Sequence, residues 1–122
     1  GWREGDVLRH AQALNDPLRA GLVPAHPDGP LPPAFGLAWA DAGNVVLDTI
    51  KRAEDGDGWI VRLYEAWQYR NETVTVTFGR PLRRAVECNL LEEEAGPAQT
   101  DGARLTFGLA PCEIRTFRVW FA

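Results

Sequence analysis

Methionine is absent from the 122 residues of this chain, which begins at Gly1. Because a natural reading frame starts with methionine, we expect the sequence to be a segment of a longer polypeptide.

Long hydrophobic runs are also missing. No stretch approaches the ~20 apolar residues that a membrane-spanning helix needs, and no segment resembles a signal peptide. A membrane is therefore not an expected partner.

Positive charge is scarce and scattered. Lys51 is the single lysine, the arginines form no stripe, and the formal net charge is −4. A nucleic acid or an anionic membrane surface is bound by a clustered basic face, so neither is an expected partner. The remaining composition, 45% hydrophobic and 25% charged, is that of an ordinary globular domain.

Cysteine occurs only at Cys88 and Cys112. Two cysteines make no disulfide framework, although one bridge is conceivable if their strands pair. Cys88 alternates with Val86 and Leu90, which predicts a buried face where a free thiol behaves as a small hydrophobe. We expect reduced, structural thiols and a cytoplasmic protein, because thiols stay reduced in that compartment.

Composition divides the chain into three zones. Residues 1–22 can form a short helix, with Asp6 as a candidate N-cap and Asn-Asp-Pro at 15–17 as its end. Residues 23–34 contain five prolines and are predicted to be a semi-rigid linker, since proline cannot donate a hydrogen bond to a sheet. Residues 35–122 show strand patterns separated by turn signals, which predicts one β-domain.

Alternating hydrophobic residues predict the strands of that domain. In residues 73–78, valine and phenylalanine would face inward while the threonines between them face water. About six or seven such strands, including a possible strand at 35–39, are typical of an antiparallel β-sandwich. The inward positions expected in the other strands are Val86, Cys88 and Leu90, then Leu105, Phe107 and Leu109, then Phe117, Val119 and Phe121, with Ile114 and Trp120 on the opposite face of the last strand.

The segment 44–65 predicts a β-hairpin with an acidic, glycine-punctuated turn, Glu-Asp-Gly-Asp-Gly, at 54–58. Asp55 and Asp57 could donate oxygens to calcium, but the other ligands of a calcium-binding loop are missing. Aspartate and glycine are also the residues that a tight turn requires for backbone reasons. We therefore interpret the segment as a turn.

The final strand has apolar residues on both faces, which predicts a cover on each side, one of them supplied by a neighbouring domain.

Several phrases of this hairpin and of the later strands resemble the C-terminal β-sandwich of family 38 glycoside hydrolases, the retaining α-mannosidases. They are "EDGDG" at 54–58, "VRLYE" at 61–65, "ECNLLEE" at 87–93 and "PCEIRT" at 111–116. The resemblance implies the same β-sandwich fold, with residues 1–22 as the tail of the preceding domain. It also implies a parent enzyme that cleaves terminal α-mannosyl residues from oligosaccharides.

In that family, zinc and the nucleophilic aspartate belong to the N-terminal catalytic domain, and none of its motifs occurs in this sequence. The resemblance therefore implies that zinc is the cofactor of the parent enzyme, that this segment holds none, and that it is inactive alone. It further implies a scaffold that packs against the upstream catalytic and central domains. His10 and His26 are too far apart and too poorly accompanied to predict a metal site of their own.

Five tryptophans raise an alternative function, that of a carbohydrate-binding module for mannose-containing oligosaccharides. An indole face can stack on a sugar ring, and residues 67–70 are expected in a loop between strands. The simpler interpretation is that Trp39 and Trp59 fill the core while Trp67 covers its edge or an interface. The candidate carbohydrate-binding residues are Trp67, Gln68, Tyr69 and Arg70.

Carboxylates at Glu87 and at residues 92–94 are of the type that glycoside hydrolysis uses. A retaining mechanism needs two carboxyl groups ~5–5.5 Å apart, one of them kept protonated by its surroundings. Three consecutive glutamates before a glycine and a proline instead predict a solvated strand end. We assign no catalytic residue in this sequence.

Overall fold

The computed structural model describes residues 1–25, 27–30 and 32–122, so His26 lies outside the described residues. The chain divides into two compact units, Gly1–Pro33 and Ala34–Ala122, and each is described by itself. Among the described residues, no helix has the length and apolar character needed to cross a membrane.

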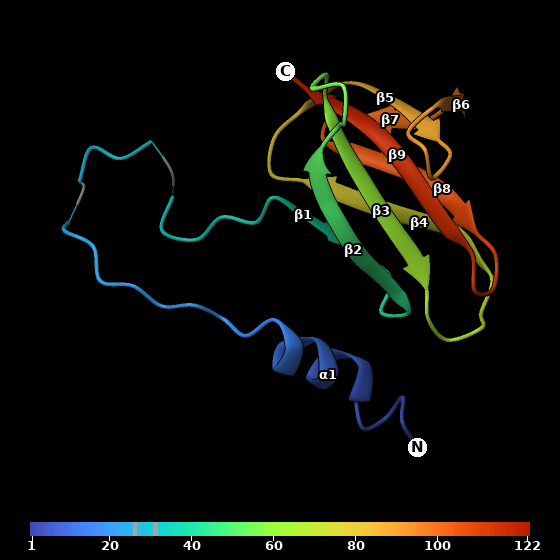
Figure 1. Ribbon diagram of the computed structural model, residues 1–122, viewed down its shortest axis with the longest axis horizontal. Helices are drawn as coiled ribbons and strands as arrows, with labels where there is room; N and C mark the ends of the chain where they lie inside the picture. The colour runs from blue at the N-terminus through green and yellow to red at the C-terminus, as the bar shows by residue number, and fades with distance from the viewer. Residues whose placement is uncertain (26, 31) are drawn as a thin grey trace. The chain divides into compact units, whose positions relative to one another are not determined.

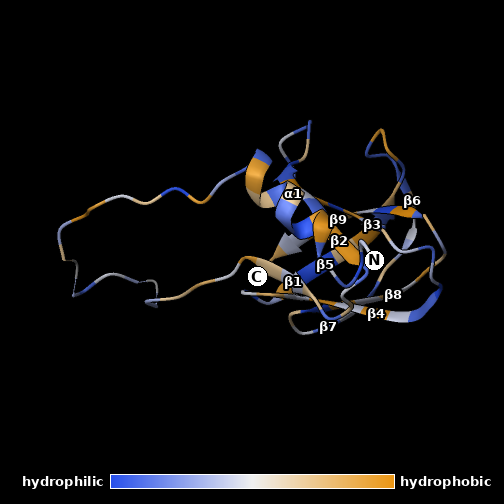
Figure 2. Ribbon diagram, turned by 90° about the horizontal axis from the view of Figure 1, so that it is seen from below, coloured by the Kyte–Doolittle hydropathy of each residue, from blue (hydrophilic) through white to orange (hydrophobic). Residues whose placement is uncertain are grey.

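The first unit contains the helix α1 (Val7–Asn15), which confirms the predicted short helix. Asp6 stands at its N-cap position, as the sequence indicates, although its side chain does not cap the helix. The backbone of Asp6 is left-handed, with φ 49°, and its side chain makes no capping hydrogen bond. No residue of α1 is buried, although hydrophobic and hydrophilic residues both occur along it (Figure 2).

The second unit is an antiparallel β-sandwich, as predicted (Figure 1). One sheet has the order β1 (Ala38–Ala40), β4 (Asn71–Phe78), β8 (Arg104–Leu109), β7 (Gln99–Asp101). The other has the order β2 (Val45–Arg52), β3 (Trp59–Glu65), β9 (Ile114–Phe121), β5 (Leu82–Cys88), β6 (Glu94–Pro97). Figure 2 shows the two layers from the side. The described residues thus form nine strands rather than six or seven; the short strands β6 and β7 lack a hydrophobic alternation that the sequence could reveal.

The core lies between the two sheets and comes from the predicted alternation. Alternate residues of a strand point to opposite faces, so each strand contributes every second side chain. Aromatic rings pack within it: the ring centroids of Phe107 and Phe117 lie 4.7 Å apart. The buried residues of this cluster are Val45, Val61, Leu63, Val74, Val76, Phe78, Leu105, Phe107, Leu109, Phe117 and Val119.

Two predicted core positions are wrong. Leu90 is 61% exposed because β5 ends at Cys88, where the side chain of Asn89 takes over the hydrogen bonding. Asn89 Oδ1 accepts hydrogen bonds from the N–H groups of Leu91 and Glu93, which replaces the strand by a turn. Trp39 is 52% exposed because it lies on the outer face of the edge strand β1, which begins at Ala38.

The acidic turn at 54–58 covers the outer face of the five-stranded sheet. Asp57 Oδ1 accepts a hydrogen bond of 2.9 Å from Trp120 Nε1, and Asp55 Oδ2 lies 2.8 Å from Arg118 Nη1. Trp120 is thereby covered by the domain itself, so this part of the face needs no neighbouring domain. Ile114, on the same strand, is exposed.

Two glycines in this turn distinguish the cost of a positive φ from the cost of a steric clash when alanine replaces them. Gly58 has φ +84°, and a Cβ there would lie 2.9 Å from Trp120 Nε1 and 3.0 Å from Val119 O. Gly56 has φ +80° with no atom within 4 Å of such a Cβ. We expect Gly56→Ala to cost about 1 kcal/mol and Gly58→Ala about 3 kcal/mol or more in the free energy of unfolding. Urea denaturation measures both, and equal costs would contradict the packing of the turn on Trp120.

Candidate functional site

The four predicted carbohydrate-binding residues lie on the loop 66–70, which connects β3 to β4. Trp67 is half-buried, and a Cβ at Gly43 would lie 3.9 Å from its ring, so the ring lies against the segment before β2. Gln68 and Arg70 are exposed, and Gln68 has φ 63°. Tyr69 is 57% exposed and is the large aromatic that this loop offers to solvent.

A buried carboxylate shapes this loop. Glu65, the last residue of β3, is only 3% exposed, and its two oxygens accept hydrogen bonds from three chain segments. Oε1 accepts from Asn44 Nδ2 at 2.9 Å and from the Trp67 N–H at 2.7 Å. Oε2 accepts from the Gln68 N–H at 2.8 Å and from the Cys112 N–H at 3.0 Å.

These bonds fix the charge state of Glu65. Burial alone would raise the pKa of the carboxyl group. The N–H of Cys112, the amide of Asn44 and further N–H groups of the loop outweigh burial and lower the pKa from 4.5 to about 2. Glu65 therefore stays ionised at neutral pH. Its lone pairs are occupied by the protein, so it is a structural carboxylate and not a general acid.

The carboxylates predicted to be solvated are also engaged in the structure. Glu92 is buried rather than solvated, which corrects the prediction: its Oε1 lies 2.7 Å from Lys51 Nζ, and its Oε2 accepts from the Glu54 N–H at 2.8 Å. These two contacts lower the pKa of Glu92. Glu87 forms an ion pair with Arg115. A retaining glycosidase needs one protonated carboxyl group, whereas the contacts of Glu92 favour its ionised form.

Among the described residues, those that could bind a metal ion and the two thiols take no part in a shared site. In the part of the chain that the structure describes, no three His, Cys, Asp or Glu side chains are grouped to hold a metal ion. Cys88 and Cys112 are free thiols, as expected; Cys88 is buried and Cys112 is exposed. Burial raises the pKa of the Cys88 thiol, which favours the inert protonated form.

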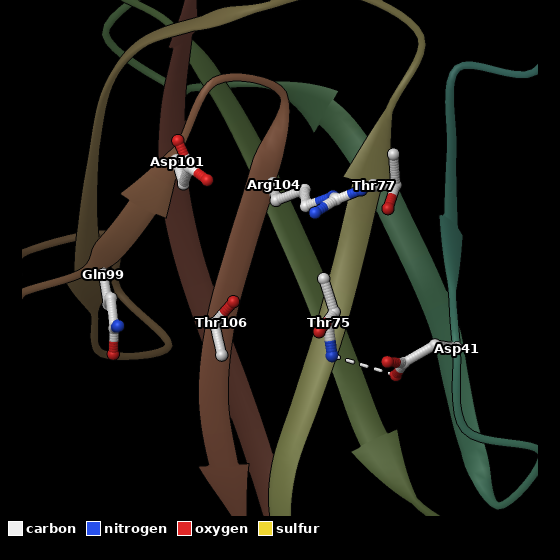
Figure 3. Close-up of a pocket in the computed structure, with 7 residues that line it drawn as sticks. All are labelled: Asp41, Thr75, Thr77, Gln99, Asp101, Arg104 and Thr106. Atoms are coloured by element: carbon white, nitrogen blue, oxygen red, sulfur yellow. Dashed lines mark hydrogen bonds between the residues drawn. The ribbon is translucent and has the colours of Figure 1, made fainter.

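Sequence reasoning missed a polar groove on the outer face of the four-stranded sheet. It has a volume of about 440 Å³ and draws on β4, β7 and β8 and on Asp41, which follows β1 (Figure 3). The threonines of β4 were expected to face water, but the pairing of β4 with β8 and of β8 with β7 was not evident in the sequence. The lining residues are Asp41, Thr75, Thr77, Gln99, Asp101, Arg104 and Thr106.

Comparison with known proteins identifies relatives of the β-sandwich. Residues 44–117 match the model of the glycosyl hydrolases family 38 C-terminal β-sandwich domain. A relative, "Alpha-mannosidase G" of Dictyostelium discoideum, is 35% identical over 79 residues. The matched region covers 61% of this chain and 7% of that protein, so the chain spans a small part of the length of this relative.

The role of Glu65 predicts a large difference between two isosteric substitutions. Glu65→Gln keeps the shape but replaces one acceptor oxygen by a donor that faces backbone N–H groups. We expect it to lower the free energy of unfolding by about 3 kcal/mol. Glu72→Gln, on an exposed carboxylate of β4, is the matched control and should change it by less than about 0.5 kcal/mol. Similar values for both variants in chemical denaturation would exclude a structural role for Glu65.

The same carboxylate predicts a pH dependence. Its folded pKa of about 2 lies below the unfolded value of 4.5, so its stabilisation is complete above the unfolded pKa and disappears as the pH falls toward 2. The stability difference between the wild type and Glu65→Gln should therefore shrink over this window, while contributions of other carboxylates cancel. Thermal unfolding at several pH values measures it, and a difference that stays constant between neutral pH and about pH 2.5 would contradict the assignment.

Proposed function

The chain belongs to the family of glycosyl hydrolase family 38 C-terminal β-sandwich domains, and from this premise we propose that it is the non-catalytic C-terminal domain of a zinc-dependent retaining α-mannosidase. In this proposal the domain is a scaffold that packs against the catalytic and central domains of the same polypeptide. The small share of the mannosidase relative that the chain matches supports a larger parent protein.

The observation that carries the scaffold role is a pair of adjacent exposed leucines. Leu90 and Leu91 are 61% and 79% exposed in the turn after β5. This turn is held by hydrogen bonds at both of its ends, including the Asn89 N–H to the Glu93 carbonyl at 3.0 Å and the Glu92 N–H to the Asn89 carbonyl at 3.1 Å. A fixed turn that presents apolar side chains is pre-organised for docking, because little entropy is lost when a partner covers it.

Charged groups surround the leucines. A shallow cavity of about 250 Å³ beside them is also lined by Lys51, Glu54, Arg62 and Glu92. Arg62 Nη2 donates to the Leu90 carbonyl at 3.3 Å, which fixes the rim to the turn. An apolar centre with a polar rim is the usual anatomy of a protein interface. We take its partner to be the upstream part of the same polypeptide.

Catalysis is assigned to that upstream part, together with its zinc. The ion pairs of Glu87 with Arg115 and of Glu92 with Lys51 support an inactive isolated domain, since the protein itself engages both carboxylates. The free thiols of Cys88 and Cys112 support a cytoplasmic location. Carbohydrate binding at the loop 66–70 stays a prediction, and the exposure of Tyr69 is the feature that supports it.

The scaffold proposal predicts that loss of the two exposed leucines has no effect on the stability of the isolated chain but destabilises the complete polypeptide. Replacing both Leu90 and Leu91 by Ser should leave the unfolding free energy of the isolated chain within about 0.5 kcal/mol, because both side chains are already in water. In the complete polypeptide the same change should lower the thermal midpoint by several degrees and reduce α-mannosidase activity.

Leu105→Ser is the positive control, since it removes a fully buried side chain and should destabilise both forms. Thermal unfolding and hydrolysis of an α-mannoside provide the readouts. A double serine variant that is neutral in the complete polypeptide would refute docking through this surface. Activity in the isolated chain would refute the non-catalytic role.

A further inference from the structure

The outer face of the four-stranded sheet presents two cross-strand rows of side chains. Residues paired across antiparallel strands lie on the same face, and here the opposite face holds the core. The first row runs from β1 to β7 through Trp39, Thr77, Arg104 and Asp101. The second row consists of Asp41, Thr75, Thr106 and Gln99, with Asp41 joined to β4 by its Oδ1, which accepts from the Thr75 N–H at 2.9 Å.

All of these residues except Trp39 line the groove of about 440 Å³, and Trp39 stands beside it through its pairing with Thr77. In Figure 3, the Arg104 side chain reaches from β8 toward Thr77, and Asp41 points toward Thr75 at the edge. Trp39 is 52% exposed, and its ring rests against Gly36, where a Cβ would lie 3.7 Å from Cε3. A supported indole thus flanks a polar, open groove.

The charges of the groove select against anionic ligands. Asp41 and Asp101 carry two negative charges and Arg104 carries one positive charge, so an anionic ligand meets net repulsion. The hydroxyl groups of Thr75, Thr77 and Thr106 both donate and accept hydrogen bonds. A ligand rich in hydroxyl groups, itself neutral, matches this mixture of donors and acceptors. The indole beside it matches the apolar C–H face of a sugar ring.

We propose that this outer groove binds a neutral oligosaccharide, with one sugar ring stacked on Trp39 and the next bonded by Thr77, Arg104 and Asp101. Strands lie ~4.8 Å apart, so Trp39 and Arg104 are separated by ~10 Å, which exceeds one sugar ring. The ligand is therefore at least a disaccharide. This site goes beyond the scaffold role and differs from the loop 66–70.

The groove and the docking surface belong to different sheets. Leu90 and Leu91 follow β5 of the five-stranded sheet, whereas the groove is built on β1, β4, β8 and β7. Sugar binding and docking can therefore be tested separately, and the failure of one leaves the other standing.

The test is a titration of the ¹⁵N-labelled 122-residue chain with α-linked mannotriose, followed by two-dimensional NMR. The indole N–H signal of Trp39 and the amides of β4 and β8 should shift in a saturable way at millimolar sugar. Trp39→Ala should weaken binding about tenfold, and Trp2→Ala, on a similarly exposed tryptophan of the first unit, is the matched control and should change nothing. Thr77→Val, which keeps the β-branched shape, should weaken binding severalfold. It provides a second test of the site in case Trp39→Ala does not fold.

The nature of the ligand is tested with two further trisaccharides. Cellotriose asks whether the groove distinguishes α-mannosyl from β-glucosyl units, and binding of either neutral sugar supports the proposal. Trigalacturonate carries negative charges and should bind at least about tenfold more weakly. The proposal is overturned by three results: no shifts with either neutral sugar at about 50 mM, shifts centred on the loop 66–70 that vanish in Tyr69→Ala, or tight binding of trigalacturonate.

Discussion

The arrangement of the two sheets depends on the carboxylate of Glu65. Three connections between the sheets meet at this residue: the segment before β2 through Asn44, the loop from β3 to β4 through Trp67 and Gln68, and the turn from β8 to β9 through Cys112. Each connection donates to Glu65 from an N–H group that would otherwise lack a hydrogen-bond partner. A buried charge is costly unless it is fully bonded, and here three backbone N–H groups and the side-chain amide of Asn44 supply the bonds. One carboxylate thereby aligns both layers at one end of the sandwich.

Several other acidic residues of the β-sandwich follow the same pattern on a smaller scale. Asp55 and Asp57 hold the acidic turn over Arg118 and Trp120, and Glu92 ties Lys51 to the backbone of Glu54. Carboxylates that suggest hydrolytic chemistry in the sequence are thus parts of the framework. What the domain offers to other molecules is its surface: two leucines in a fixed turn on one sheet, and a polar groove beside a tryptophan on the other.

Much of the fold follows from local patterns in the sequence. The hairpin of β2 and β3 and the strands β4, β8 and β9 are evident because their hydrophobic residues alternate and glycine or aspartate marks their turns. Leu90 was misplaced because the capture of Leu91 and Glu93 by the Asn89 side chain competes with strand pairing, which alternation does not reveal. The sequence interpretation places Trp39 in the core, whereas its position on an edge strand turns it outward. Both cases depend on pairing partners distant in the sequence.

The sites were harder to predict than the strands. The exposed side chain of Tyr69 follows from a loop assignment, but the burial of Glu65 and Glu92 depends on N–H groups and a lysine brought together by folding. The outer groove joins residues from 41 to 106, and only the sheet order places them in two rows. The presence of charged and hydroxyl-bearing residues in the sequence does not indicate which of them lie side by side.

Native-state hydrogen exchange of the amides of Trp67, Gln68 and Cys112 tests the central claim most directly. These residues lie outside regular strands, where amides normally exchange quickly. If Glu65 joins the inter-sheet connections, the three amides exchange slowly and together with those of β3, through opening of the whole sandwich. Exchange as fast as that of the exposed turn at Gly102 would show that the connections open independently, and would contradict the account.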